Sequence, residues 1–137
     1  MNTMSCDNDS VTDYGGKPYV TNINVQAIRN RNYRTALWTG ENLQLTLMSI
    51  PVGSDIGVEM HEDTDQFIRI VNGRAMVQFG DCREDLKNAQ RVDGNYAVFV
   101  PAGTWHNIVN IGNTPLKLYS IYAPPHHPFG TIQKCKG

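Results

Sequence analysis

Short apolar stretches with a period of two, separated by turn signals every eight to twelve residues, constrain the fold of this chain more than any other feature. Residues 42–50 are the clearest case. They alternate between one face with Leu43, Leu45 and Leu47 and another with Gln44, Thr46 and Met48. Alternation of this kind places successive side chains on opposite faces of a β-strand. Pro51 and Gly53 then end the stretch.

The rest of the chain repeats this pattern. Strand-like runs at 66–80 are joined at Asn72-Gly73, a strong hairpin signal. Further runs cover 95–100, 105–111 and 116–123, and only 83–90 has a helical composition, over two turns. Many short strands with almost no helix predict an all-β fold, an antiparallel sandwich or barrel.

Length and charge exclude several classes of protein. A chain of 137 residues fits one domain, which we place at 17–125, after a polar leader at 1–16 and before a tail at 126–137. The net charge of −1 favours neither nucleic acid nor an anionic membrane as a partner. No secretion signal opens the chain, and Cys6, Cys82 and Cys135 are interpreted as reduced thiols. We therefore expect a cytoplasmic protein.

Polar side chains interrupt the apolar pattern at one place. Glu59 and His61 are two residues apart, so in a strand both project from the same face. Gln66 opens the next strand, and His106 follows a Pro-Ala-Gly turn far along the chain. Two imidazoles, a carboxylate and an amide oxygen suit a divalent first-row metal ion, with coordination positions left open. The spacing therefore predicts a metal site at Glu59, His61, Gln66 and His106.

These residues lie in two segments that resemble the conserved motifs of the cupin superfamily. Residues 53–73 are similar to the first motif, with Gly53, His61 and Gly73 in register. Residues 94–110 are similar to the second, with one extra residue before Pro101; its matching positions are Pro101, Gly103, His106 and Asn110. The resemblance implies a jelly-roll β-barrel, and in particular one of the small cupins labelled mannose-6-phosphate isomerase-like.

Two ligand positions differ from the usual cupin motif, and these differences affect which metal ion the site would bind. The usual cupin ligands are three histidines and a glutamate, whereas here Glu59 stands for the first histidine and Gln66 for the glutamate. The ligand charge is −1 in both sets, which favours a retained metal. Gln66 is either a ligand or a residue that orients a metal-bound water. The set leans toward Mn or Fe, with Ni or Zn possible.

Several further expectations follow. If Gln66 and His106 face inward, the outward apolar residues of their strands need cover from the N-terminal segment or from a second subunit, and we expect a homodimer. His126 and His127 belong either to an exposed tail or to the mouth of the barrel. The sequence also offers possible pocket linings: Tyr33, Arg34, Trp38, Tyr96 and Tyr122.

Two classes of function remain open. One is a metal-dependent enzyme, of the isomerase or dioxygenase type, acting on a small sugar or organic acid. The other is a module that binds or senses a metal or a small molecule without turnover. The fold cannot choose between them, because one fold serves many chemistries.

Overall fold

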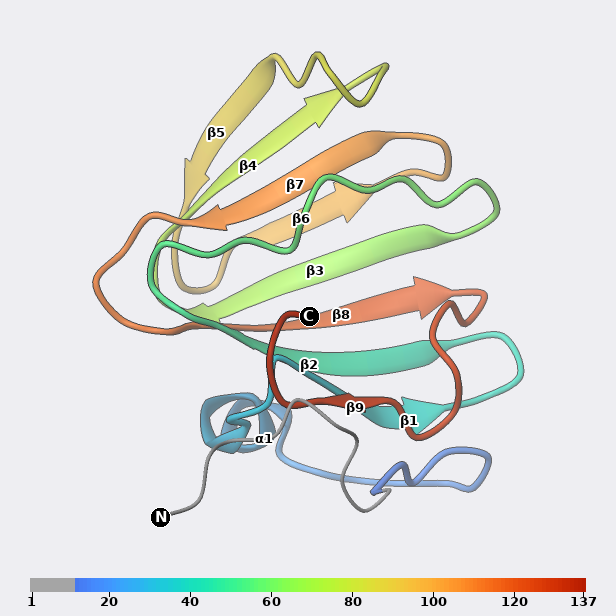
Figure 1. Ribbon diagram of the computed structural model, residues 1–137. Coiled ribbons are helices and arrows are strands. Elements are labelled where there is room, and N and C mark those ends of the chain that lie inside the picture. The colour runs from blue at the N-terminus through green and yellow to red at the C-terminus, as the bar shows by residue number, and fades with distance from the viewer. Residues whose placement is uncertain (1–11) are drawn as a thin grey trace.

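The structure is a computed structural model that describes residues 12–137 (Figure 1). It contains one short helix in this range and otherwise strands and turns. The elements, in chain order, are α1 (Ile23–Arg29), β1 (Arg34–Thr39), β2 (Gln44–Ile50), β3 (Asp65–Asn72), β4 (Ala75–Gly80), β5 (Asn88–Val92), β6 (Ala97–Val100), β7 (Trp105–Asn110), β8 (Leu116–Ala123) and β9 (Ile132–Gln133).

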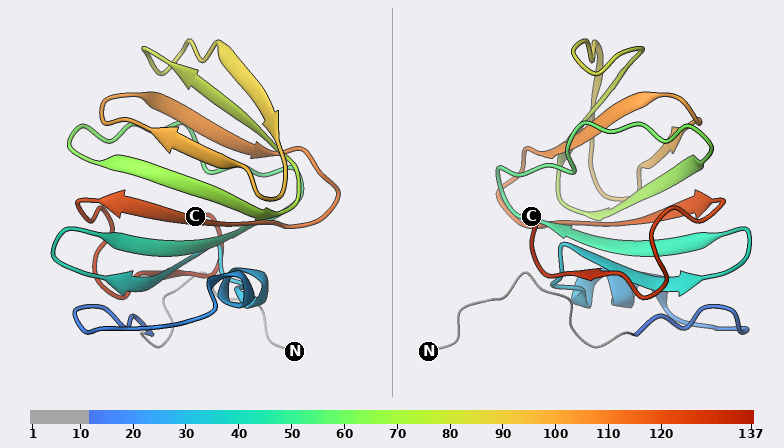
Figure 2. Two further views of the ribbon diagram at one scale, coloured as in Figure 1. Left: turned by 180° about the vertical axis from the view of Figure 1, so that it is seen from behind. Right: turned by 45° about the vertical axis from the view of Figure 1, so that its right-hand side comes forward.

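The strands form two sheets in which every pairing is antiparallel. The six-stranded sheet has the order β6-β3-β8-β2-β1-β9, and the three-stranded sheet has the order β5-β4-β7 (Figure 2). One buried apolar cluster draws on both sheets, including Met48, Ile68 and Leu118 from the first and Val77 and Ile108 from the second. The prediction of an all-β antiparallel fold is confirmed, and closure into a barrel stays a prediction.

The alternation read from the sequence gives the correct inward faces. On β3 the residues Gln66, Ile68 and Ile70 are buried, and on β7 the same holds for His106, Ile108 and Asn110. Both strands begin at the same end of the molecule (Figure 1). Gln66 and His106 are therefore brought to one end of the space between the sheets.

The N-terminal segment covers part of the outer face of the six-stranded sheet. Helix α1 begins after Asn22, whose Oδ1 accepts a hydrogen bond from the Val25 N–H at 3.1 Å. Its Ala27 packs in a second apolar cluster with residues of β1, β2, β3 and β8: Leu37, Leu45, Leu47, Phe67, Val71 and Tyr119. One of the two expected sources of cover is thus confirmed for this face, although the sequence analysis did not predict the helix.

Two expectations about local structure are wrong. Residues 83–90 are not helical but form turns that lead into β5, which pairs with β4. A two-turn helix is only marginally stable by itself, whereas residues 88–92 pair in register with β4. Asn72-Gly73 is not a hairpin turn, since β3 and β4 belong to different sheets. Gly73 has φ 111°, but Asn72 does not share the positive φ that a type I′ turn requires at both positions.

The two ends of the described chain are attached to the sheet. Asp13, in the predicted leader, accepts hydrogen bonds from the Thr39 N–H and the Gly130 N–H, each at 3.0 Å. Residues 1–11 of that leader lie outside the described residues. Beyond Pro125 the chain is not an exposed tail, because β9 pairs with β1 and Ile132 is buried.

Two smaller findings concern the thiols and the membrane. Cys82 is free and exposed, whereas Cys135 is disulfide-bonded, so the interpretation of Cys135 as a reduced thiol is wrong. Cys6 lies outside the described residues. Within residues 12–137, no helix has the length and apolar character to span a bilayer.

Asn110 holds the turn between β7 and β8, and its loss is expected to destabilise the fold. Its Nδ2 donates to the carbonyls of Ile50 and Thr114, both at 2.9 Å, and its Oδ1 accepts from the Gly112 N–H. Asn110→Ala leaves these groups without partners, so the free energy of unfolding in urea should fall by about 2 kcal/mol. The exposed Asn113→Ala should change it by less than about 0.5 kcal/mol. Equal effects would contradict this role of Asn110.

Candidate metal centre

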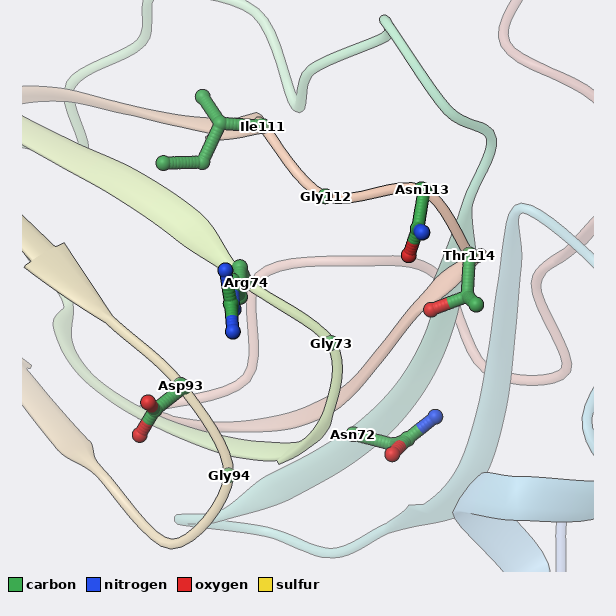
Figure 3. Close-up of a pocket in the computed structure, with 9 residues that line it drawn as sticks. All are labelled: Asn72, Gly73, Arg74, Asp93, Gly94, Ile111, Gly112, Asn113 and Thr114. Atoms are coloured by element: carbon green, nitrogen blue, oxygen red, sulfur yellow. The ribbon is translucent and has the colours of Figure 1, made fainter.

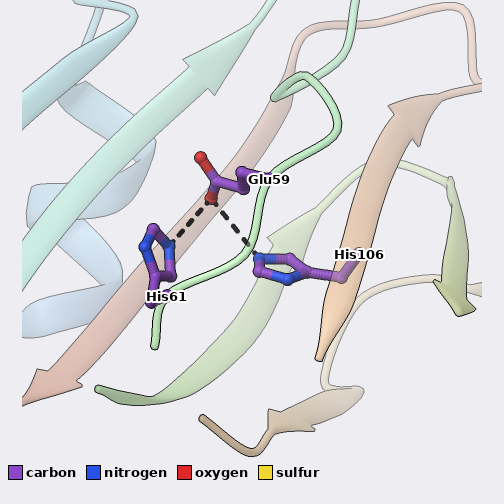
Figure 4. Close-up of side chains that lie close together, drawn as sticks. All are labelled: Glu59, His61 and His106. Carbon is purple, nitrogen blue, oxygen red and sulfur yellow. Dashed lines mark hydrogen bonds and ion pairs between the residues drawn. The ribbon is translucent and has the colours of Figure 1, made fainter. Parts of the chain in front are cut away.

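Glu59, His61 and His106 converge at the end of the space between the sheets where β3 and β7 begin. Glu59 and His61 lie on the segment that joins β2 to β3, and His106 lies on β7 (Figure 4). One potential ligand atom from each residue lies within 4.8 Å of the other two. The structure thus brings together three of the four predicted ligands.

Backbone hydrogen bonds explain this convergence. Glu59 and His106 form an isolated antiparallel bridge, with N–H to carbonyl distances of 3.0 and 2.9 Å. Directly opposed residues of an antiparallel pair place their side chains next to each other on the same face. His61 is fixed in turn because its carbonyl accepts a hydrogen bond from the Gly103 N–H at 2.8 Å.

One carboxylate oxygen lies between two imidazoles. The Oε1 of Glu59 is 3.3 Å from the Nε2 of His61 and 3.4 Å from the Nε2 of His106. Burial by itself would raise the pKa of the Glu59 carboxyl. When they carry a proton on Nε2, the imidazoles of His106 and His61 outweigh this effect through hydrogen bonds and charge, and hold that pKa well below its usual range. Glu59 is therefore an anion across the physiological pH range.

The tautomer of His106 can be assigned from its surroundings. Its Nδ1 lies 3.0 Å from the carbonyl oxygen of Thr104, which can only accept, so Nδ1 carries a proton. In the neutral ring, Nε2 then directs a lone pair toward the Glu59 carboxylate. This atom is buried and has no hydrogen-bond partner in the described part of the chain. Two electron-rich atoms this close require a cation between them, either a proton or a metal ion.

The donor set fits a metal ion by its chemistry. A ligating histidine usually donates its second ring N–H to a carbonyl or carboxylate, and Thr104 is such an acceptor for His106. Two histidines and one carboxylate, with further positions open, form the ligand set of many mononuclear divalent centres.

Gln66, the fourth predicted ligand, is buried close to this group. Its Nε2 donates to the Ser120 hydroxyl at 3.3 Å and the Tyr122 hydroxyl at 3.2 Å. Its Oε1 is buried without a hydrogen-bond partner among the described residues. Such an oxygen can serve either of the two predicted roles, as a ligand or as an acceptor for metal-bound water, and the choice stays open.

The segment after β8 returns to the centre, so His126 and His127 lie at its mouth. The His126 ring centroid is 4.0 Å from that of His61, and the His127 Nε2 is 3.4 Å from the Tyr122 hydroxyl. Burial, together with the positive charge of Arg34, lowers the pKa of His127 to about 3, and burial also lowers the pKa of His126. Both rings are therefore neutral at pH 7.

Gln44 holds this segment in place, a role that sequence reasoning missed. The side chain is fully buried. Its Oε1 accepts from the backbone N–H groups of His126 and His127 at 3.1 and 2.8 Å, and its Nε2 donates to the His127 carbonyl at 2.8 Å. The signal available in the sequence was a long polar side chain at the start of a leucine-rich strand.

The predicted pocket linings divide into two groups. Tyr122 is buried beside His61, with ring centroids 5.8 Å apart, and Tyr33 and Arg34 are buried as well. Trp38 instead donates to the Lys17 carbonyl and lines a hollow under the N-terminal segment, and Tyr96 is exposed. The last two are therefore wrong as linings of this site.

A separate hollow of about 640 Å³ lies at the opposite end of the sheets. It is formed by the turns after β3, β5 and β7, with Arg74 and Asp93 at its sides (Figure 3). Glu59, His61 and His106 do not line it. The size of a hollow therefore does not mark the candidate site in this molecule, and the convergence of ligating side chains does.

The residue pattern of the cupin domain family matches residues 46–122, which include all four predicted ligands. The chain belongs to the cupin family. The fold and the two motifs agree with this assignment, whereas a mannose-6-phosphate isomerase-like subtype does not follow from it.

This cupin has close relatives. It is 56% identical over 124 residues to the uncharacterized protein YrkC of Bacillus subtilis, covering 90% of this chain and 67% of YrkC. The crystal structure of BH2720 from Bacillus halodurans is 56% identical with a TM-score of 0.89, covering 90% of this chain and 94% of that one. KdgF from Halomonas sp. is 19% identical with a TM-score of 0.59, covering 68% and 80% of the two chains; this similarity shows the fold alone.

Metal content tests the assignment of the ligands. Glu59→Gln and His106→Ala should each lower bound metal per chain by about tenfold or more, since even outer partners of ligands change metal affinity 10- to 100-fold. Elemental analysis of protein purified without chelators or a histidine tag measures this content.

Glu62→Gln is the matched control, because Glu62 is exposed three residues from Glu59. It should retain the metal content of the unmodified protein. Circular dichroism should show that all three variants are folded. Unchanged metal content in both Glu59→Gln and His106→Ala would reject the ligand assignment.

Proposed function

We propose that this cupin is an enzyme that holds one divalent metal ion through Glu59, His61 and His106 and acts there on a small polar metabolite. The observation that supports the proposal best is the buried His106 Nε2 atom, which faces the Glu59 carboxylate at 3.4 Å without a hydrogen-bond partner among the described residues. Mn or Fe is the favoured ion, with Ni or Zn as the alternatives.

Each residue contributes a distinct part of the proposed site. Glu59 and the two imidazoles would hold the ion, which would supply Lewis-acid chemistry or, as iron, redox chemistry with O₂. Tyr122, whose pKa is raised to about 12 by burial, stays protonated and can donate a hydrogen bond to a bound molecule. His126 and Tyr122 form one wall of the site, with ring centroids 5.7 Å apart.

Turnover with a defined metal separates this enzyme from the alternative, a binding module without catalysis. Apo protein should be loaded anaerobically with Fe(II) or Mn(II) and mixed with a panel of organic acids, sugars and diketones. We expect product formation or oxygen consumption with at least one compound, and a loss of at least about 100-fold in Glu59→Gln. Metal and ligand binding without turnover across the panel would favour the non-catalytic module.

We also propose that the protein is a homodimer. Phe99 is 71% exposed on the edge strand β6, and its ring centroid lies 5.1 Å from that of Phe67. Together with Ile121 these side chains line a hollow of about 340 Å³ on the outer face of the six-stranded sheet. Apolar surface of this kind favours burial against a second copy.

The oligomeric state tests this proposal. Phe99→Glu should convert a dimer into a monomer, because a charge cannot be buried unpaired in an apolar interface. Phe129→Glu, at a position 57% exposed elsewhere on the molecule, should leave the dimer intact. Light scattering coupled to size-exclusion chromatography measures the mass, and a monomeric unmodified protein would contradict the proposal.

A further inference from the structure

Arg34 is a buried cation without an ionic partner in the described structure. Arg34 is the first residue of β1 and is only 7% exposed. None of the ion pairs within residues 12–137 includes it. No other lysine or arginine is buried in that range. An uncompensated charge in the interior is costly, so its presence calls for an explanation other than stability.

The guanidinium carbon lies 5.4 Å from the centroid of the Tyr33 ring, and one edge of the group has no oxygen acceptor. Nη1 donates to Gln133 Oε1, on β9. Nη2 has only the thioether sulfur of Met48, 3.9 Å away, which is a weak acceptor. Nε is buried without a hydrogen-bond partner among the described residues. Nε and Nη2 form the side of the guanidinium that binds a carboxylate through two parallel hydrogen bonds, and this side is the one left unsatisfied.

Arg34 faces the same interior as the candidate metal centre. Met48, its cross-strand partner on β2, belongs to the apolar cluster between the sheets. The Arg34 charge lowers, and the Glu59 charge raises, the pKa of the same four side chains: Tyr33, Tyr122, His126 and His127. The anion that Arg34 lacks would therefore share this interior with the site around Glu59.

We infer that the metabolite of this cupin carries a carboxylate, which the Nε and Nη2 atoms of Arg34 bind while the rest of the molecule lies at the metal centre. A water molecule could satisfy the N–H groups but not the charge. The two coplanar oxygens of a carboxylate match the Nε and Nη2 edge, and its single charge balances that of Arg34. The inference rests on the proposed function, because it names the substrate class of that site.

Binding to the metal-free protein tests this inference apart from catalysis. Chelator-treated protein is titrated calorimetrically with malonate and succinate, and with malonamide and succinamide as neutral analogues of the same shape. The carboxylates should bind and the amides should not. Arg34→Met should weaken carboxylate binding by roughly tenfold or more, the effect of a charge-assisted hydrogen bond.

Three comparisons separate recognition from a structural role. Arg34→Lys keeps the charge but lacks the planar fork, so its affinity should fall between those of Arg34→Met and the unmodified protein. Arg83→Met removes an exposed arginine and should bind carboxylates normally. Without ligand, Arg34→Met should be at least as stable as the unmodified protein, since it removes a buried unpaired charge.

Equal binding of carboxylates and amides, or full carboxylate affinity in Arg34→Met, would overturn the inference. If Arg34→Met does not fold, full affinity in Arg34→Lys at both carboxylates would overturn it instead. The proposed function fails separately, through absence of bound metal or of turnover. Carboxylate binding that depends on Arg34 in a protein that takes up no metal would support the inference while rejecting the function.

Discussion

The carboxylate of Glu59, set between the Nε2 atoms of His61 and His106, is the constraint around which this end of the molecule is organised. A partly buried anion facing an imidazole lone pair is unfavourable unless a cation joins them. The backbone bridge between Glu59 and His106 nevertheless imposes this arrangement. The segment between β2 and β3 is therefore held against β7 in an arrangement that a proton or a metal ion shared by the two side chains stabilises.

The sequence predicts the strands well where burial is simple. On β3 and β7 a period of two fixes which side chains face inward, and Gln66 and His106 are buried as expected. Prediction from the sequence fails where the pairing of a strand depends on residues far away in the chain. Nothing local shows that Asn72-Gly73 connects two sheets, or that 88–92 joins β4 instead of continuing a helix. The short helix α1 depends on the outer face of β1, β2 and β8 for its stability.

Some residues of the candidate site could likewise be predicted from the sequence, and others could not. Glu59, His61 and His106 could be named in advance because they lie at motif positions on neighbouring elements. The roles of Gln44 and Arg34 could not, since each follows from what a buried side chain does or does not meet in three dimensions. Gln44 satisfies backbone groups more than 80 residues away in sequence, and the Nε of Arg34 is buried without a hydrogen-bond partner among the described residues. Whether a buried polar atom has a hydrogen-bond partner depends on the folded structure and cannot be read from the sequence.

Hydrogen bonds to Gln44 hold the loop that carries His126 and His127 at the mouth of the candidate site. Gln66, His106 and Tyr122 belong to paired strands, which tolerate few changes, whereas His126 and His127 lie on a proline-rich loop held by Gln44. Loops of this kind accept substitutions and altered lengths more readily than sheets do. Substitutions in this loop would therefore alter what the site admits while the strands beneath it keep their pairing.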